Sequence, residues 1–282
     1  MILPKHQFQP RLLTTIDGAS INVMPVPLRR DDPSTPWCYA ASLSPFIPLD
    51  DDKNDDSTTF TSSTLPMGTN FLATQVWPSS RIASTIIERY MNLSWSVCEL
   101  GCGPGLPSLT AAKNGSRKVI ATDVDELALE MVHAAALEQG FIQDNTYEVG
   151  IDDNVEEMQQ QFVTRRFDLT SQNERLPNAD LYILSDVFES SAVAEGAAWH
   201  IKTILSENRQ NTIQKANDEK RVWVFAQSDR SQRDSFLASM REWFDENCDG
   251  EGKILDWTMN HNPDPDEQLW LFDLDETMVE YN

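Results

Sequence analysis

The stretch that most constrains the fold of this chain is residues 97–105, which read VCELGCGPG. An apolar run ends near a carboxylate, Glu99, and three glycines follow at alternate positions. Side chains in such a turn would keep the backbone from approaching a ligand laid across the strand end. Residues 106–113 are typical of a helix, with Pro107 in its first turn. The pattern therefore predicts a strand, a tight turn and a helix around a ligand site.

A second strand is predicted at residues 118–123, and it ends in Asp123. Two neighbouring strands thus deliver two acids to one crevice. The glycines at positions 101, 103 and 105 do not have the G-x-G-x-x-G spacing of a dinucleotide fingerprint, whose third glycine lies close to a pyrophosphate. The turn is therefore not typical of a phosphate-binding loop.

This combination of strand, acid, glycine spacing and second acid resembles the cofactor motif of class I (seven-β-strand) S-adenosylmethionine-dependent methyltransferases. The resemblance implies that Glu99 helps to hold the amino acid end of S-adenosyl-L-methionine through the loop and water. It implies that Asp123 binds both ribose hydroxyls. A sulfonium cofactor has no phosphate, so phosphate-seeking geometry is not required. The further cofactor-binding candidates in this stretch are Gly101, Cys102, Gly103, Gly105 and Val124.

The chain is predicted to divide into three segments. Residues 1–30 contain β-rich runs on both sides of Asp17 and Gly18, a signal for a two-residue turn, so an N-terminal β-hairpin extension is expected. Residues 31–66 are acidic and rich in Pro, Ser and Thr, and they are predicted as a loop. Residues 67–282 are predicted as the S-adenosylmethionine-binding methyltransferase domain.

The fold class expected for this last segment is α/β. The resemblance implies a Rossmann-like, doubly wound, seven-stranded sheet, mostly parallel, with an antiparallel C-terminal strand. Strand patterns at residues 162–169, 180–185 and 221–227 alternate with helical ones. The last two predicted strands, at 253–259 and 268–273, have no helix between them, as the resemblance predicts for a closing antiparallel pair. A nicotinamide dehydrogenase would more often continue its crossover helices.

A second resemblance concerns Trp77, which precedes a helix that starts with small residues. The arrangement resembles the lysine methyltransferase-like branch, which includes nicotinamide N-methyltransferase-like sequences. In that branch the Trp lies against the cofactor; an ordinary core aromatic is the alternative. The branch also has an acidic residue near the adenine amine after its third strand, with a neighbour packed on the ring. Asp168 and Phe167 are the candidates for these two roles.

The predicted fourth strand ends in Ser185, a further cofactor-binding candidate, and Asp186. The branch carries an Asp at this strand end and an aromatic, usually Tyr, three residues later; here Glu189 stands in the Tyr position. A lysine acceptor must lose a proton, because a protonated amine has no lone pair. Asp186 is the first candidate for the catalytic residue that positions the acceptor, and Glu189 is the second. Helix capping and a solvated carboxylate are the respective alternatives.

The charge of the chain restricts its partners. The formal net charge is −23 and the sequence pI is about 4.4, which argues against nucleic acid because phosphate contacts need clustered Lys and Arg. The negative electrostatic field of such a chain would attract a lysine-rich protein, although an acidic surface can also serve solubility alone. The four cysteines and four histidines are scattered, so no metal site is expected and free thiols in a reducing compartment are the simplest interpretation.

No membrane association is expected, because no apolar run reaches the ~18 residues of a bilayer span and the N-terminus lacks a signal-peptide core. We therefore expect a cytoplasmic location, with a nuclear location and organelle targeting as open alternatives. The sequence does not indicate the oligomeric state.

The predicted function is S-adenosylmethionine-dependent methyl transfer, with a protein lysine as the favoured acceptor. A small-molecule N-methyltransferase would share every cofactor residue, and a catalytically silent binding protein remains open because the Tyr is missing. A nucleotide-dependent oxidoreductase would need a phosphate-binding turn, and Pro104 removes one backbone donor from this one.

Overall fold

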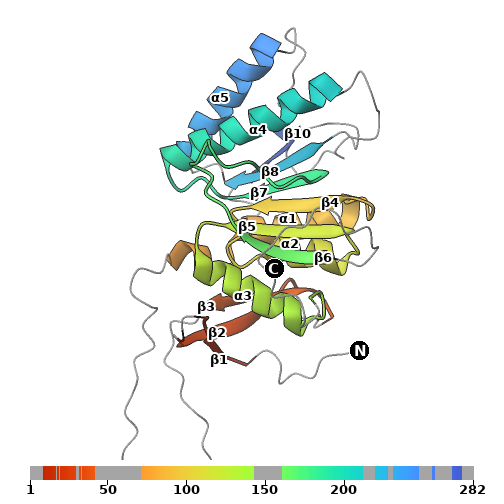
Figure 1. Ribbon diagram of the computed structural model, residues 1–282, viewed down its shortest axis with the longest axis vertical. Coiled ribbons are helices and arrows are strands. Elements are labelled where there is room, and N and C mark those ends of the chain that lie inside the picture. The colour runs from red at the N-terminus through yellow and green to blue at the C-terminus, as the bar shows by residue number, and fades with distance from the viewer. Residues whose placement is uncertain are drawn as a thin grey trace, which may run out of the picture.

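A seven-stranded sheet forms the centre of the computed structural model, with strand order β6-β5-β4-β7-β8-β10-β9 (Figure 1). Its strands are β4 (Ser96–Leu100), β5 (Lys118–Asp123), β6 (Gln161–Arg166), β7 (Leu181–Ser185), β8 (Arg221–Gln227), β9 (Asp256–Trp257) and β10 (Leu269–Leu274). The residues that the structure describes are 9–16, 18, 20–29, 32, 34–41, 71–142, 161–211, 220–227, 231–247, 256–257 and 269–274. The seven-stranded Rossmann-like α/β fold expected from the sequence is confirmed.

Alternation along the strands builds two hydrophobic cores on opposite faces of the sheet. In β4, Val97 belongs to one core and Cys98 to the other. The first face is covered by α1 (Pro78–Tyr90), α2 (Leu106–Lys113) and α3 (Glu126–Glu138). The second is covered by α4 (Ser191–Asn211) and α5 (Ser231–Asn247), which lie together in Figure 1. None of the helices in the described part of the chain is long and apolar enough to cross a membrane.

A separate antiparallel sheet precedes the central one and consists of β1 (Arg11–Thr14), β2 (Ser20–Pro27) and β3 (Trp37–Ala41). The expected N-terminal hairpin is confirmed, but its two-residue turn is wrong, because the last pair joins Thr14 to Ser20 and leaves five residues between them. The strand β3 lies within residues 31–66, which the sequence analysis predicts as a loop. All five of its residues are buried, and this burial outweighs the polar composition around it. The domain boundaries at residues 30 and 66 stay predictions.

The N-terminal sheet packs against α3, and in Figure 1 it lies on the side of α3 that faces away from the central sheet. Arg11 and the Tyr39 hydroxyl both contact the carboxylate of Glu138, and Arg11 also donates to Tyr39 Oη at 3.0 Å. The backbone of Trp37 exchanges two hydrogen bonds with the side chain of Gln139, at 3.2 and 2.8 Å. Polar contacts thus fix the extension at the C-terminal end of α3.

The C-terminal strand differs from the expectation. β10 pairs in parallel with both β8 and β9, so the predicted antiparallel C-terminal strand is wrong. Eleven residues, 258–268, connect β9 to β10. Extended chain covers about 3.3 Å per residue, so a connection of this length can return to the starting edge of the sheet. The lack of a helical pattern in this connection therefore does not force the chain to reverse its direction.

Candidate functional site

Strand register places three polar side chains on the same face of the sheet. Glu99 in β4 pairs with Ala121 in β5 and Ile183 in β7. Residues paired across a sheet share a face, and so do residues two apart along a strand. Asp123 and Ser185, each two residues beyond the partner of Glu99, therefore face the same side as Glu99. All three are buried, with 1%, 7% and 7% of their surface exposed respectively.

These side chains meet where the strand order reverses. The chain runs from β4 outward to β5 and β6, and then returns to the other side of β4 to form β7. Ligands of open α/β sheets bind outside the carboxyl ends of the strands at such a switch point. Glu99, Asp123 and Ser185 lie at or near the carboxyl ends of β4, β5 and β7. The fold therefore gathers polar groups where an α/β sheet binds its ligand.

The turn between β4 and α2 requires its glycines. Gly101, Gly103 and Gly105 have φ angles of 69°, 49° and 71°, a region in which residues with a Cβ are strained. A Cβ on Gly101 would lie 2.6 Å from Val187 Cγ1, and one on Gly105 would lie 2.6 Å from Val132 Cγ2. Other elements thus pack directly on the turn, and its conformation is fixed by both strain and contact.

Asp123 ties β5 to this turn. Its Oδ2 accepts a hydrogen bond from the Gly103 backbone N–H at 2.8 Å, and its Oδ1 accepts one from the Asp125 N–H at 2.9 Å. Burial raises the pKa of this carboxyl above its ordinary value, while both backbone hydrogen bonds act in the opposite direction. The second predicted acid therefore lies against the central glycine of the turn.

Glu99 is held from the other side of the turn. Its Oε2 accepts hydrogen bonds from the Ser108 N–H at 2.9 Å and from Ser108 Oγ at 2.5 Å. Burial raises the pKa of Glu99 to about 8, and the negative charge of Asp123 contributes in the same direction. The two acids are thus close enough to influence each other electrostatically, as expected if they serve one crevice.

Two buried polar atoms at this place have no hydrogen-bond partner among the residues that the structure describes. They are Glu99 Oε1 and Ser185 Oγ. Buried polar groups are nearly always hydrogen-bonded, so such atoms point to a ligand or an ordered water. A free carboxylate oxygen accepts hydrogen bonds and attracts positive charge. The residues present therefore fit a ligand with a cationic donor group and further hydroxyl groups.

Part of this chain is similar in sequence to known proteins. The family model described as Ribosomal protein L11 methyltransferase (PrmA) matches residues 77–173, roughly a third of the sequence. A ribosomal protein L11 methyltransferase from Thermotoga neapolitana is 29% identical over 103 residues, which are 35% of this chain and 39% of that protein. One from Ruminiclostridium cellulolyticum is 36% identical over 53 residues, 19% of this chain and 17% of that protein. The chain thus matches less than half of the length of these curated relatives.

Among solved structures, a ribosomal protein L11 methylase from Lactobacillus delbrueckii subsp. bulgaricus is 18% identical. The alignment covers 67% of this chain and 80% of that one, with a TM-score of 0.38.

The matched segment starts at Trp77 and contains β4, the glycine turn, α2, β5, α3 and β6. The described sheet is Rossmann-like and α/β, and the match to the methyltransferase family model is confined to residues 77–173. The matching family model is that of the ribosomal protein L11 methyltransferases, so the narrower lysine methyltransferase-like branch is not confirmed.

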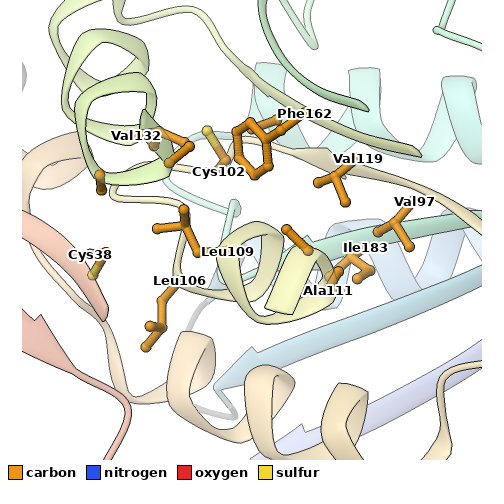
Figure 2. Close-up of a cluster of buried hydrophobic side chains, with 14 of the residues drawn as sticks. Cys38, Val97, Cys102, Leu106, Leu109, Ala111, Val119, Val132, Phe162 and Ile183 are labelled. Atoms are coloured by element: carbon orange, nitrogen blue, oxygen red, sulfur yellow. The ribbon is translucent and has the colours of Figure 1, made fainter. Parts of the chain in front are cut away.

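Around the glycine turn, the predicted neighbours of the two acids lie in different environments. The side chain of Cys102 is buried in the first core, beside Val132 and Phe162 in Figure 2, and its N–H donates to the Thr122 carbonyl at 2.8 Å. Val124, directly after Asp123, is 45% exposed. The side chain of Cys102 is therefore used in the core, whereas Val124 offers an exposed apolar side chain.

Trp77 is the residue directly before α1, and it is half-buried. Its indole Nε1–H donates to the Leu72 carbonyl at 3.1 Å, in the short 3-10 helix η2 (Phe71–Thr74). The indole N–H is therefore used within the chain. Contact of its ring with a cofactor stays a prediction.

Phe167 and Asp168 follow β6 directly. Phe167 is 2% exposed and lies in the second core, with its ring centroid 5.1 Å from that of His200. Asp168 is half-buried, and its Oδ1 accepts hydrogen bonds from Thr170 N–H and Oγ1, which lower the pKa of Asp168. Both lie at the carboxyl end of β6, next to β5, but Phe167 faces the core. Their adenine contacts stay predictions.

Asp186 has a φ of 54°, the only positive φ of a non-glycine residue in the described part of the chain. Its N–H donates to the Phe225 carbonyl at 2.8 Å, so the strained residue is anchored to β8. Such outliers cluster at functional sites, and Asp tolerates this region better than most residues. Glu189, three residues later, is exposed. Of the two predicted acceptor residues, Asp186 has the more constrained geometry.

Ser108 and η2 belong to the site but were not predicted from the sequence. Ser108 is the main partner of Glu99, and a hydroxyl in the first turn of the helix after the glycines was the available signal. η2 approaches the turn so closely that a Cβ on Gly103 would lie 3.2 Å from the Ala73 carbonyl oxygen. No local pattern predicts this approach, because the two segments are about thirty residues apart.

Proposed function

We propose that this chain is an S-adenosylmethionine-dependent methyltransferase that acts on an amine of a protein. One observation carries the proposal: the buried acids Glu99 and Asp123 share a face of the sheet and lie on either side of the same glycine turn. The partial match to the family model of ribosomal protein L11 methyltransferases supports the same reaction class.

The donor set suits the cofactor. Asp123 is an anionic acceptor beside the turn and is assigned to the ribose hydroxyls. Glu99 Oε1, which has no partner in the described residues, is assigned to the ammonium of the amino acid end, whose positive charge would favour the ionised form of this carboxyl and so oppose the effect of burial on its pKa. Val124 supplies an exposed apolar surface next to Asp123 for the adenine ring. Each assignment pairs a group of the ligand with a side chain of matching chemistry.

When bound, the cofactor would supply an electrophilic methyl group for transfer to the nitrogen of an unprotonated acceptor amine. The chain therefore mainly has to align the reactants, which contributes about 7 to 11 kcal/mol at best. Asp186 is assigned to the acceptor amine, because its constrained backbone directly after β7 fixes the position from which its side chain extends.

The proposed acceptor is a lysine side chain. The matched relatives are named for methylation of a ribosomal protein, which favours a protein acceptor over a small molecule. The net charge of −23 favours a cationic segment over an acidic one. Membership of the lysine methyltransferase-like branch remains part of the proposal, and a cytoplasmic location accords with a ribosomal acceptor.

Calorimetric titration with S-adenosylhomocysteine tests the cofactor site. The wild type is expected to bind in the micromolar range or tighter, and Asp123→Ala is expected to abolish measurable binding. Glu126→Gln is the matched control, because it removes a nearby exposed carboxylate and should leave the Kd unchanged. Unfolding curves of each variant separate loss of the site from loss of the fold. Equal binding by the wild type and Asp123→Ala would reject the proposed site.

The acceptor class is tested with radiolabelled cofactor and a cell extract. A labelled protein band that is absent with Asp186→Asn supports the proposal. Label confined to small solutes would instead assign a small-molecule N-methyltransferase. Cofactor binding without any transfer would indicate a catalytically silent binding protein.

A further inference from the structure

The short helix η2 connects the N-terminal sheet to the glycine turn. On one side, Gln75 Nε2, directly after η2, donates to the Ala41 carbonyl at the end of β3, at 3.5 Å. On the other, the Ala73 carbonyl oxygen lies 3.2 Å from the position that a Cβ on Gly103 would occupy. Thr74 between them is fully buried. The backbone of η2 therefore rests on the same glycine that donates its N–H to Asp123.

Trp77 holds η2 in this position. The Leu72 carbonyl accepts the indole N–H of Trp77 at 3.1 Å and the backbone N–H of Gln75 at 3.5 Å. Pro78 follows Trp77 and disfavours helical backbone there, and Trp77 is extended, with φ −83° and ψ 152°. The side chain is thus directed back over the segment that precedes α1 and closes a loop of six residues, 72–77.

The segment held by Trp77 lies beside the glycine turn. Leu72, next to Ala73, is 42% exposed, and Val124, next to Asp123, is 45% exposed. The Ala73 carbonyl oxygen lies close to Gly103, and Asp123 accepts the Gly103 N–H, so each exposed apolar residue directly adjoins a residue that packs on or binds the central glycine. A shift of η2 would therefore change the packing on Gly103 and the position of Leu72 relative to Asp123.

We propose that Trp77 is a positioning residue, whose indole N–H fixes η2 as a wall of the cofactor crevice. This differs from the role expected by resemblance, in which the Trp ring itself lies against the cofactor. The inference rests on the proposed function, since the crevice is assigned to S-adenosylmethionine. It makes the hydrogen-bonding group of Trp77, rather than its aromatic surface, the functional feature.

The test removes the N–H while keeping the ring. Trp77 is replaced by β-(3-benzothienyl)alanine, which carries sulfur in place of the indole N–H, and separately by Phe. The S-adenosylhomocysteine Kd is expected to rise about 3- to 10-fold in both, the effect of one ordinary hydrogen bond. Amide hydrogen exchange at residues 72–75 is expected to accelerate, with the exchange of α2 unchanged. Trp95→Phe, before β4 at the opposite end of the sheet, is the matched control and should change neither.

The outcomes separate the inference from the proposed function. If the wild type binds S-adenosylhomocysteine, and the benzothienyl variant has the same Kd and the same amide exchange at residues 72–75, the inference is overturned. A loss of binding in Trp77→Ala alone would then assign the role to the aromatic ring. If the wild type itself does not bind S-adenosylhomocysteine, the proposed function is wrong and the inference falls with it. Slower exchange at 72–75 on ligand binding, lost in the benzothienyl variant, supports the inference.

Discussion

The carboxylate of Glu99 accepts both the N–H and the hydroxyl of Ser108 through one oxygen, at 2.9 and 2.5 Å, while its other oxygen has no partner in the described residues. A buried acid with one unused oxygen is costly to ionise, and the pKa of Glu99 is accordingly raised to about 8. The native protein thus retains a proton at a pH at which the unfolded chain, with an ordinary pKa of 4.5, has lost it.

The first prediction concerns Glu99→Gln. Between pH 4.5 and about 8 the native state binds more protons than the unfolded state, so the free energy of unfolding of the wild type falls as pH rises through this window. Gln keeps an oxygen for Ser108 and does not titrate. The free energy of unfolding of the variant should therefore rise relative to that of the wild type as the pH rises through this window, by on the order of 5 kcal/mol. Urea unfolding at several pH values measures it, and parallel curves would contradict the raised pKa.

A second prediction compares two glycines with positive φ. A Cβ on Gly105 would lie 2.6 Å from Val132 Cγ2, whereas one on Gly115 would meet nothing within 4 Å. Val132 is fully buried and β-branched, so it cannot turn away. Gly105→Ala should cost about 2 to 4 kcal/mol, and Gly115→Ala only the strain of about 1 kcal/mol. Denaturant unfolding of both variants checks the difference, and equal losses would show that the packing on the turn is looser than described.

A third prediction reverses a rule of helix propensity. Gly196 lies inside α4, where Ala would ordinarily stabilise by about 1 kcal/mol. A Cβ there would lie 2.1 Å from the Leu169 carbonyl oxygen, in the segment that follows β6. Gly196→Ala should therefore destabilise, by about 2 kcal/mol or more. The melting temperature measures the sign, and Glu195→Ala, at the exposed position before it, is a nearly neutral control. A stabilised Gly196→Ala would contradict the close approach.

The fourth prediction separates the two acceptor acids. Asn tolerates positive φ, so Asp186→Asn should fold with nearly unchanged stability while it loses the charge next to the acceptor. Its kcat/KM for a lysine peptide should fall about 10- to 100-fold, and the Kd for S-adenosylhomocysteine should change little. Glu189→Gln, at an exposed position, should change kcat/KM less than about 3-fold. An equal loss in both would exclude the preferential role of Asp186.

The sequence predicted the centre of the fold closely because its signals there are local. The glycine turn, the helix Leu106–Lys113 and the strand Lys118–Asp123 have the predicted bounds. Each of these features depends on residues a few positions apart: strand alternation, a proline in a first helical turn, glycines at positive φ.

Other features were decided by contacts between distant segments. The strand β3 is buried along its whole length although its neighbours in sequence are polar. The direction of β10 is set by its parallel pairing with β8, which no local sequence pattern specifies. η2 reaches Gly103, and Phe167 faces the core, through packing of elements far apart in the chain.

The sequence by itself determined which residues stand at the strand ends: Glu99, Asp123 and Asp186 are fixed there by the period of two and by the breaks that stop each element. Only the tertiary structure decided how these residues are used. Burial raises the pKa of Glu99, and strand order sets Asp123 against Gly103. Desolvation and long-range contact depend on neighbours that no local pattern specifies.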